Sequence, residues 1–150
     1  MTVWLGKWRA ILLDKALNYL ALARKGGNAE LGEEPVGAIT RAGKGYLVLV
    51  ASDASDHTWR RAKSFVAGTE QQCIRVSFSK DELGFAVGRT SLAIAAITDP
   101  ALALALVKAL GDPEKHKTAL EVLAAKAEKA KKRKAEANAH KRNVRIGKKK

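Results

Sequence analysis

The sequence is poor in cysteine and has no long apolar run. Its one cysteine, Cys73, excludes an internal disulfide. Cys73 stands in the apolar stretch CIRVSF, where we expect a buried small hydrophobic residue rather than a nucleophile. A run of about 18 apolar residues is absent, which excludes a membrane-spanning helix. The apolar N-terminal stretch is interrupted by charges, unlike a signal peptide, so a cytoplasmic protein is expected.

The residues needed for catalysis or for holding a cofactor are also missing. His57, His116 and His140 are far apart in sequence and lack the spacing of metal ligands. Asp53, Ser55 and His57 are neighbours, but Ser55 is better placed to cap a helix than to act as a nucleophile. Neither a dinucleotide glycine fingerprint nor the Gly-Lys-Ser/Thr of a phosphate loop is present. We therefore expect no enzyme, no cofactor and no metal.

Positive charge is abundant and unevenly placed. The formal net charge is +13, of which the residues up to Leu110 contribute +4 and those from Gly111 onward contribute +9. Such a balance predicts an anionic partner, with nucleic acid favoured over an anionic membrane surface. The unbroken basic run Lys131, Lys132, Arg133 and Lys134 is predicted to bind phosphates, the alternative being a merely solvated charge run.

Strands and helices alternate along the first 111 residues. Apolar runs bounded by turn residues predict strands near residues 29–31, 46–50, 73–77 and 93–98. Helical spacing from Trp8 to Ala23, a glycine-led start at residue 32 and a capping box at Ser79 and Glu82 predict the intervening helices. The alternation indicates the α/β class, with a three-layer α/β/α sandwich around a mixed four-stranded sheet.

Residues 112–150 are expected to form a separate basic extension of the domain at residues 1–111. Asp112-Pro113 is predicted to start a helix, because proline is tolerated in a first turn. Leu120, Val122 and Leu123 are predicted to pack on the domain. Beyond Ala130 the apolar stripe ends, and we expect the helix to fray into a disordered basic tail.

Three stretches together resemble one known family. They are LARKGGNAELGEE, then YLVLVASDASDHT, then VSFSKDELGFAVGRTSLAIAAITD. In order and spacing they resemble small bacterial members of the L-seven-Ae ribosomal protein family, which contains kink-turn RNA binders and ribosomal proteins. The resemblance covers about residues 8–110. Its most specific pieces are the Leu-Gly-x-Ala-x-Gly stretch from Leu83 to Gly88 and the Asp53-Ala54-Ser55 turn after a strand.

The resemblance implies a two-part RNA site. One part is the start of the second helix, and the other is the loop after the Leu-Gly-x-Ala-x-Gly helix. Unpaired N–H groups at a helix start suit phosphates, and glycines let backbones approach closely. On this sequence the two parts fall at Gly32, Glu33 and Glu34, and at Gly88, Arg89, Thr90 and Ser91.

The second helix departs from the family pattern. The kink-turn binders carry Gly-x-Asn-Glu-x-x-Lys, whereas this chain has Glu34, Pro35 and Ala38 after Gly32 at the three defined positions. The resemblance therefore implies the fold more strongly than it implies kink-turn specificity.

Two further groups have both a functional and a structural interpretation. Arg24, Lys25 and Asn28 flank a double glycine near the expected RNA face, but cations also suit an ordinary helix C-terminus. Trp59 lies among Arg60, Arg61 and Lys63, where it would either stack on RNA or form part of the core.

The sequence thus predicts an RNA-binding protein for structured RNA, ribosomal RNA above all, associated with the ribosome or with translation factors. The alternative is a protein-interaction module of the same fold in translation or stress regulation. Which RNA is bound and the oligomeric state are not specified by the sequence.

Overall fold

The computed structural model describes residues 14–148, with side chains to residue 142. Trp8 and Leu12, which the sequence assigns to the first helix, lie outside the described residues. Within them, α2 (Lys15–Lys25) is capped by Asp14, whose carboxylate accepts from the N–H of Ala16 at 2.9 Å. The α2 face formed by Ala16, Leu17, Leu20 and Ala23 is buried, and of these Ala16 and Ala23 belong to the predicted helical spacing.

Four short strands form one mixed sheet. They are β1 (Ala29–Leu31), β2 (Leu47–Val50), β3 (Gln72–Arg75) and β4 (Ile94–Ile97), in the order β1-β4-β2-β3. β2 runs parallel to β3, and β4 runs antiparallel to both β1 and β2. All residues of the central strands β2 and β4 are buried, because helices cover both faces. The predicted mixed four-stranded α/β/α sandwich is confirmed.

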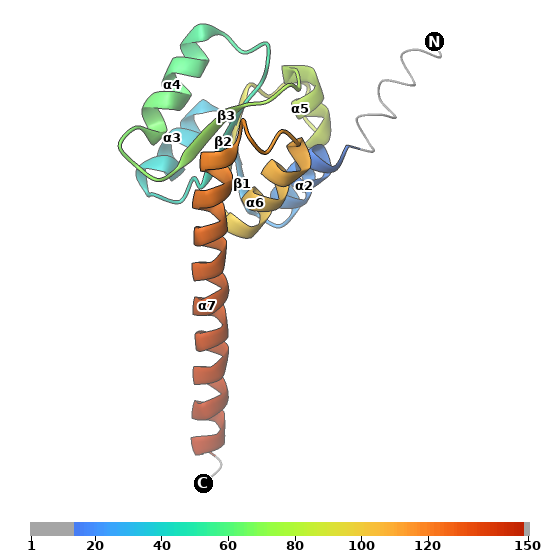
Figure 1. Ribbon diagram of the computed structural model, residues 1–150. Coiled ribbons are helices and arrows are strands. Elements are labelled where there is room, and N and C mark those ends of the chain that lie inside the picture. Colours follow the sequence, from blue (N-terminus) through green and yellow to red (C-terminus); the bar gives the residue numbers. More distant parts are fainter. Residues whose placement is uncertain (1–13, 149–150) are drawn as a thin grey trace.

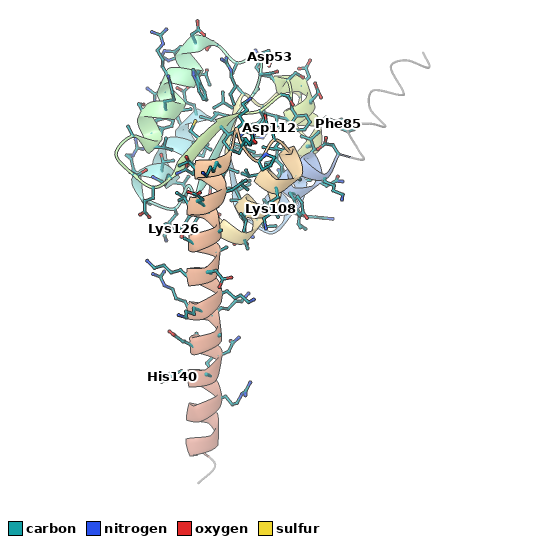
Figure 2. All side chains as sticks on the ribbon, viewed as in Figure 1. Asp53, Phe85, Lys108, Asp112, Lys126 and His140 are labelled. Carbon is teal, nitrogen blue, oxygen red and sulfur yellow. The ribbon has the colours of Figure 1, made fainter. Side chains whose placement is uncertain are left out.

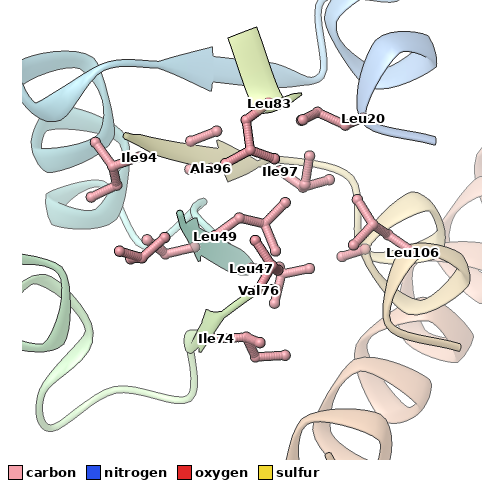
Figure 3. Close-up of a cluster of buried hydrophobic side chains, with 14 of the residues drawn as sticks. Leu20, Leu47, Leu49, Ile74, Val76, Leu83, Ile94, Ala96, Ile97 and Leu106 are labelled. Atoms are coloured by element: carbon pink, nitrogen blue, oxygen red, sulfur yellow. The ribbon is translucent and has the colours of Figure 1, made fainter. Parts of the chain in front are cut away.

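The helices divide between the two faces of the sheet (Figure 1). α3 (Glu33–Arg41) and α4 (Asp56–Val66) pack together on one face, and α2, α5 (Lys80–Ala86) and α6 (Pro100–Leu110) lie on the other. Strand side chains such as Leu47, Leu49 and Ile97 meet the helices in the core shown in Figure 3. Full burial of one such side chain contributes about 1.5–3 kcal/mol.

The last helix, α7 (Lys117–Lys148), begins on the domain and then leaves it. Ala119 and Leu123 are buried beside α6, and Lys126 forms an ion pair with Glu70 in the loop before β3. Beyond Lys126 the helix projects away from the sheet, and His140 lies far out along it (Figures 1 and 2). The first turns of α7 therefore pack as part of the domain.

Two features of this helix differ from the sequence prediction. The residues from Pro113 to His116 form a turn, so the helix begins at Lys117 and not at Asp112-Pro113. It also continues to Lys148, although the sequence predicts that it frays beyond Ala130. Alanine, lysine and glutamate dominate this stretch, and all three are strong helix formers even without an apolar stripe. The division into domains at residue 111 remains a prediction.

Candidate nucleic-acid interface

The start of α3 presents backbone N–H groups at one end of the sheet. Gly32 precedes the helix with φ 98° and ψ 160°, a conformation that side chains other than glycine rarely adopt. Its N–H donates to the carbonyl of Ile94 at 3.0 Å, which ties the turn to β4. No described side chain caps α3, so the N–H groups of Glu33 and Glu34 have no partner within the helix. This end of α3 can accept an anion through its backbone.

The loop after α5 folds back onto its own helix. The capping box fixes the helix start, since the N–H of Glu82 donates to Ser79 Oγ at 3.2 Å and the N–H of Ser79 donates to Glu82 Oε1 at 3.4 Å. Gly88 then adopts φ 74°, and the N–H of Arg89 donates to the carbonyl of Gly84 at 2.8 Å. The loop is therefore held by the backbone. The side chains of Arg89 and its two successors are exposed.

The sheet register brings these two elements to one end of the sheet, the Gly32–Arg89 edge, where β1 and β2 end and β4 begins. In the antiparallel β1–β4 pair, Leu31 lies opposite Ala95, so Gly32 comes next to the residue with which β4 begins. The N–H of Ala51, after β2, donates to the carbonyl of Ala93 at 2.9 Å at the same edge. The α3 start and the loop of residues 88–91, which precedes β4, therefore lie at the same end of the sheet. That they bind RNA remains a prediction.

The Asp53-Ala54-Ser55 turn supports this edge. Asp53 Oδ1 accepts from the N–H of Lys80 at 2.8 Å, and the N–H of Ser52 donates to the carbonyl of Phe78 at 2.8 Å. The carboxylate thus satisfies an N–H at the start of α5 across 27 residues of sequence. Sequence reasoning identified the turn as a family motif but gave Asp53 no such positioning role.

Glu33 forms an ion pair with Arg61 of α4. Arg61 also lies over the ring of Phe65, with its guanidinium carbon 5.2 Å from the ring centroid. The pairing places a cation beside a carboxylate that would otherwise repel a phosphate at the α3 start. Sequence reasoning missed it, because the two residues are far apart in the chain. Glu34, one residue further along α3, is exposed.

The predicted RNA-binding residues of the first loop lie before β1, away from Gly32. They are Arg24, Lys25 and Asn28. They follow the end of α2 and precede β1, and the carbonyl of Asn28 accepts from the N–H of Thr98 after β4. Gly32 follows the other end of β1, and a three-residue strand separates the two ends by about 10 Å. The direction of β1 thus places them at the opposite end of that strand from Gly32, and their contact with RNA stays a prediction.

The basic run from Lys131 to Lys134 lies on the projecting part of α7. All four side chains are exposed, and the structure does not bring them to the edge that holds Arg89.

Trp59 is half-buried, as expected for partial core, with the charged groups of Lys63 and Arg75 at 5.4 and 5.5 Å from its ring centroid.

Cys73 is only partly buried, because it lies on the edge strand β3 rather than inside the sheet. Burial, opposed weakly by the charge of Lys63, raises the pKa of this thiol to about 11. It therefore remains protonated at neutral pH and is a poor nucleophile.

Two kinds of site are absent from the part of the chain that the structure describes. Its His, Cys, Asp and Glu side chains form no group of three or more that could hold a metal ion. None of its helices combines the length and the apolar character needed to cross a membrane.

Known structures share the fold of this chain. A protein of unknown function from Bacillus halodurans aligns with a TM-score of 0.62 at 24% identity, over 66% of this chain and 99% of that one. The 15.5kD RNA-binding protein of Giardia lamblia aligns with a TM-score of 0.54 at 20% identity, over 68% of this chain and 86% of that one. At these identities the likeness shows the fold alone, which is that of the L-seven-Ae proteins.

No protein-family model matches the chain. One relative matches the chain in sequence. The RNA-binding protein YlxQ of Enterococcus faecium is 35% identical over 76 residues, which is 51% of this chain and 73% of that protein. The match spans most of the relative, and the chain belongs to the family of the RNA-binding protein YlxQ.

Proposed function

We propose that this chain is an L-seven-Ae-type protein that binds structured RNA, with ribosomal RNA as the main candidate and with a role at the ribosome or in translation. The observation that carries the proposal is the juxtaposition of two backbone elements at one sheet edge. The α3 start offers N–H groups that suit a phosphate, and the loop of residues 88–91 holds Arg89 at the same end of the sheet by a backbone hydrogen bond to Gly84. The name of the relative YlxQ supports RNA as the ligand.

The two charged parts of the chain have different roles in this proposal. The sheet edge recognises the shape of the RNA, because its N–H groups and Arg89 are held by hydrogen bonds to β4 and α5. The exposed Lys131–Lys134 run on α7 adds phosphate attraction that is independent of sequence. Arg24 and Lys25, at the other end of β1, are left out of this interface.

The first turn of α3 does not carry the residues with which the family recognises kink-turns. Glu34 and Pro35 stand in the first turn of α3, where a carboxylate disfavours phosphate and a proline has no N–H to donate. Of the first-turn residues, only Glu33 and Glu34 keep a backbone N–H without a partner in the helix. We therefore propose recognition of a structured RNA through backbone contacts and Arg89.

Arg89→Ala tests the proposal against its protein-interaction alternative. The full chain is titrated with a kink-turn RNA and with a single strand of equal length, using fluorescence anisotropy. Loss of a base-edge contact should weaken structured RNA binding by about 1–3 kcal/mol, the magnitude known for DNA bases, with a smaller loss on the single strand. Arg24→Ala, an exposed arginine at the other end of β1, is the matched control and should bind as the unaltered chain does.

The outcomes separate the hypotheses. Equal losses on both RNAs would reduce Arg89 to a phosphate contact, and no loss on either would remove the loop from the interface. If the purified chain carries no nucleic acid by its A260/A280 ratio and binds neither RNA at low salt, the protein-interaction alternative replaces the proposal.

A further inference from the structure

A pocket of about 320 Å³ lies at the outer edge of the sheet, away from the Gly32–Arg89 edge. Trp59 of α4 forms one side, and Cys73 and Arg75 of β3 line its floor. Lys115 and His116, in the turn that precedes α7, close the other side. The pocket thus lies between the sheet domain and the basic extension, partly beyond the residues that resemble the family.

The backbone of β3 contributes to this pocket. β3 is the last strand of the sheet, and the N–H groups of Gln72 and Val76 donate to the carbonyls of Tyr46 and Val50 on the β2 side. Because a parallel strand alternates its hydrogen-bonding sides with period two, the N–H groups of Cys73 and Arg75 point away from β2. These donors face the side of the sheet on which the pocket lies.

Arg75 has an unused donor at this place. Its Nη2 donates to the carbonyl of Ala54 at 2.9 Å, which fixes the guanidinium. Its Nε is buried and has no hydrogen-bond partner within the described residues. A buried donor left without a partner is unfavourable, so a ligand that accepts from Nε would be favoured.

The charges around the pocket favour an anion. Arg75 and Lys115 line it, His116 adds a titratable group, and no carboxylate is among the described lining residues. The Cys73 thiol has a pKa raised to about 11 by burial, so it brings no negative charge at neutral pH. The N–H of Lys115 donates to Asp112 Oδ1 at 3.4 Å, which holds the turn carrying the lysine.

An aromatic wall beside these cations narrows the ligand class. Nucleobases stack on tryptophan rings and on guanidinium planes, and Trp59 and Arg75 both line this pocket. Its volume lies at the lower end of the range for small-ligand sites, about 300–1,000 Å³, which suits a single nucleotide. A bare phosphate would leave the aromatic wall unused, and an acidic peptide would leave the same wall without a stacking partner.

We propose that this pocket binds one nucleotide unit, with its phosphate near Arg75, Lys115 and the β3 N–H groups and its base against Trp59. The unit is either a free nucleoside monophosphate or one residue of a single-stranded RNA. The pocket does not depend on the proposed RNA interface at the Gly32–Arg89 edge.

The test is a titration of the full 15N-labelled chain with uridine 5′-monophosphate, followed by NMR. The indole N–H of Trp59 and the amides of Cys73 and Arg75 should shift. Uridine alone and inorganic phosphate alone should each bind more weakly, since each makes half of the contacts. A uridine hexamer tests the second source: tighter binding at the same signals indicates a residue of single-stranded RNA, and equal or weaker binding indicates a free nucleotide.

Lys115→Glu and Lys108→Glu form a matched pair. Both lysines are exposed, but only Lys115 lines the pocket. Loss of a hydrogen bond between charged groups should weaken nucleotide binding at least about tenfold in Lys115→Glu. Lys108→Glu should bind as the unaltered chain does, because its side chain lies outside the pocket.

Three results would overturn the proposal. They are unshifted pocket signals with both the mononucleotide and the hexamer, equal losses in the two lysine variants, and equally strong binding of an oligoglutamate peptide at the same signals. Arg89→Ala separates the two proposals of function. If it abolishes kink-turn RNA binding and leaves the mononucleotide shifts intact, the two sites are independent.

Discussion

Gly84 and Ser91 approach so closely that a Cβ atom at position 84 would stand 2.8 Å from the Cα of Ser91. It would also stand 2.9 Å from the carbonyl oxygen of Arg89. Both obstacles are backbone atoms, which cannot rotate out of the way as a side chain can. The glycine therefore allows the loop of residues 88–91 to lie against α5, and the position of Arg89 depends on it.

Gly84→Ala should displace this loop. Forcing a methyl group into a closed contact typically costs about 1–3 kcal/mol, measured by chemical denaturation. RNA binding should fall even where the variant is fully folded, because Arg89 moves relative to the α3 start. Gly26→Ala is the control: its φ is −85°, and its Cβ would meet the end of the Asn28 side chain at 3.2 Å and the carbonyl oxygen of Leu22 at an ordinary 3.5 Å. Normal RNA binding by folded Gly84→Ala would show that the loop is not part of the interface.

Glu33→Gln should strengthen RNA binding. The carboxylate of Glu33 stands at a helix start that is proposed to receive a phosphate, and its removal frees Arg61 from the ion pair. Both side chains are partly exposed, so the pair itself should contribute no more than about 0.2–1 kcal/mol to the free energy of unfolding. Anisotropy titrations at low salt measure the affinity, and Glu121→Gln on α7 controls for the change in net charge. Weaker RNA binding by Glu33→Gln would mean that the carboxylate itself contacts the RNA.

Local signals in the sequence located the elements well. The capping box at Ser79 and Glu82 and the Ser55 cap of α4 are present as hydrogen bonds in the structure. Such caps act over three or four residues, so the sequence alone can show them. The burial of β2 and β4 likewise follows from their continuous apolar runs.

Contacts between distant segments could not be predicted in the same way. The bond from Lys80 N–H to Asp53, the Glu33–Arg61 pair and the Lys126–Glu70 pair join residues that only the tertiary fold brings together. The position of Arg24, at the opposite end of β1 from Gly32, has the same origin. The sequence shows that a strand follows it, but the direction of β1 relative to the RNA face depends on the strand order of the whole sheet.

The alkylation of Cys73 should have an unusual pH profile. Iodoacetamide reacts with the thiolate, and burial raises the pKa of this thiol from 9.0 to about 11. In the folded chain the rate should still be climbing at pH 10, whereas in urea it should level off near the ordinary value. The same difference predicts that the contribution of Cys73 to stability is present below pH 9 and is lost as the pH rises toward 11. A folded-state profile that levels off near pH 9 would contradict the burial.

Removal of the distal part of α7 should flatten the salt dependence of RNA binding. Residues 131–150 carry ten Lys and Arg against Glu136 alone, so they hold a net charge of +9. A cut after Gly111 would also remove Leu123, whose side chain is fully buried, and would expose the α6 surface that it covers. A cut after Ala130 instead retains Leu123 and the Lys126–Glu70 ion pair. The shortened chain should therefore unfold at nearly the same temperature as the full chain.

The slope of log affinity against log salt then counts the phosphates that the tail contacts. Each lost contact should reduce the slope by about 0.7–0.9, depending on whether the RNA is single-stranded or helical. A second variant replaces Lys131, Lys132, Arg133 and Lys134 by glutamine, which preserves helix propensity and removes only their charge. If the salt dependence of RNA binding falls as much in the glutamine variant as in the shortened chain, these four residues make the phosphate contacts. An unchanged slope in both variants would show that α7 beyond Ala130 touches no phosphate.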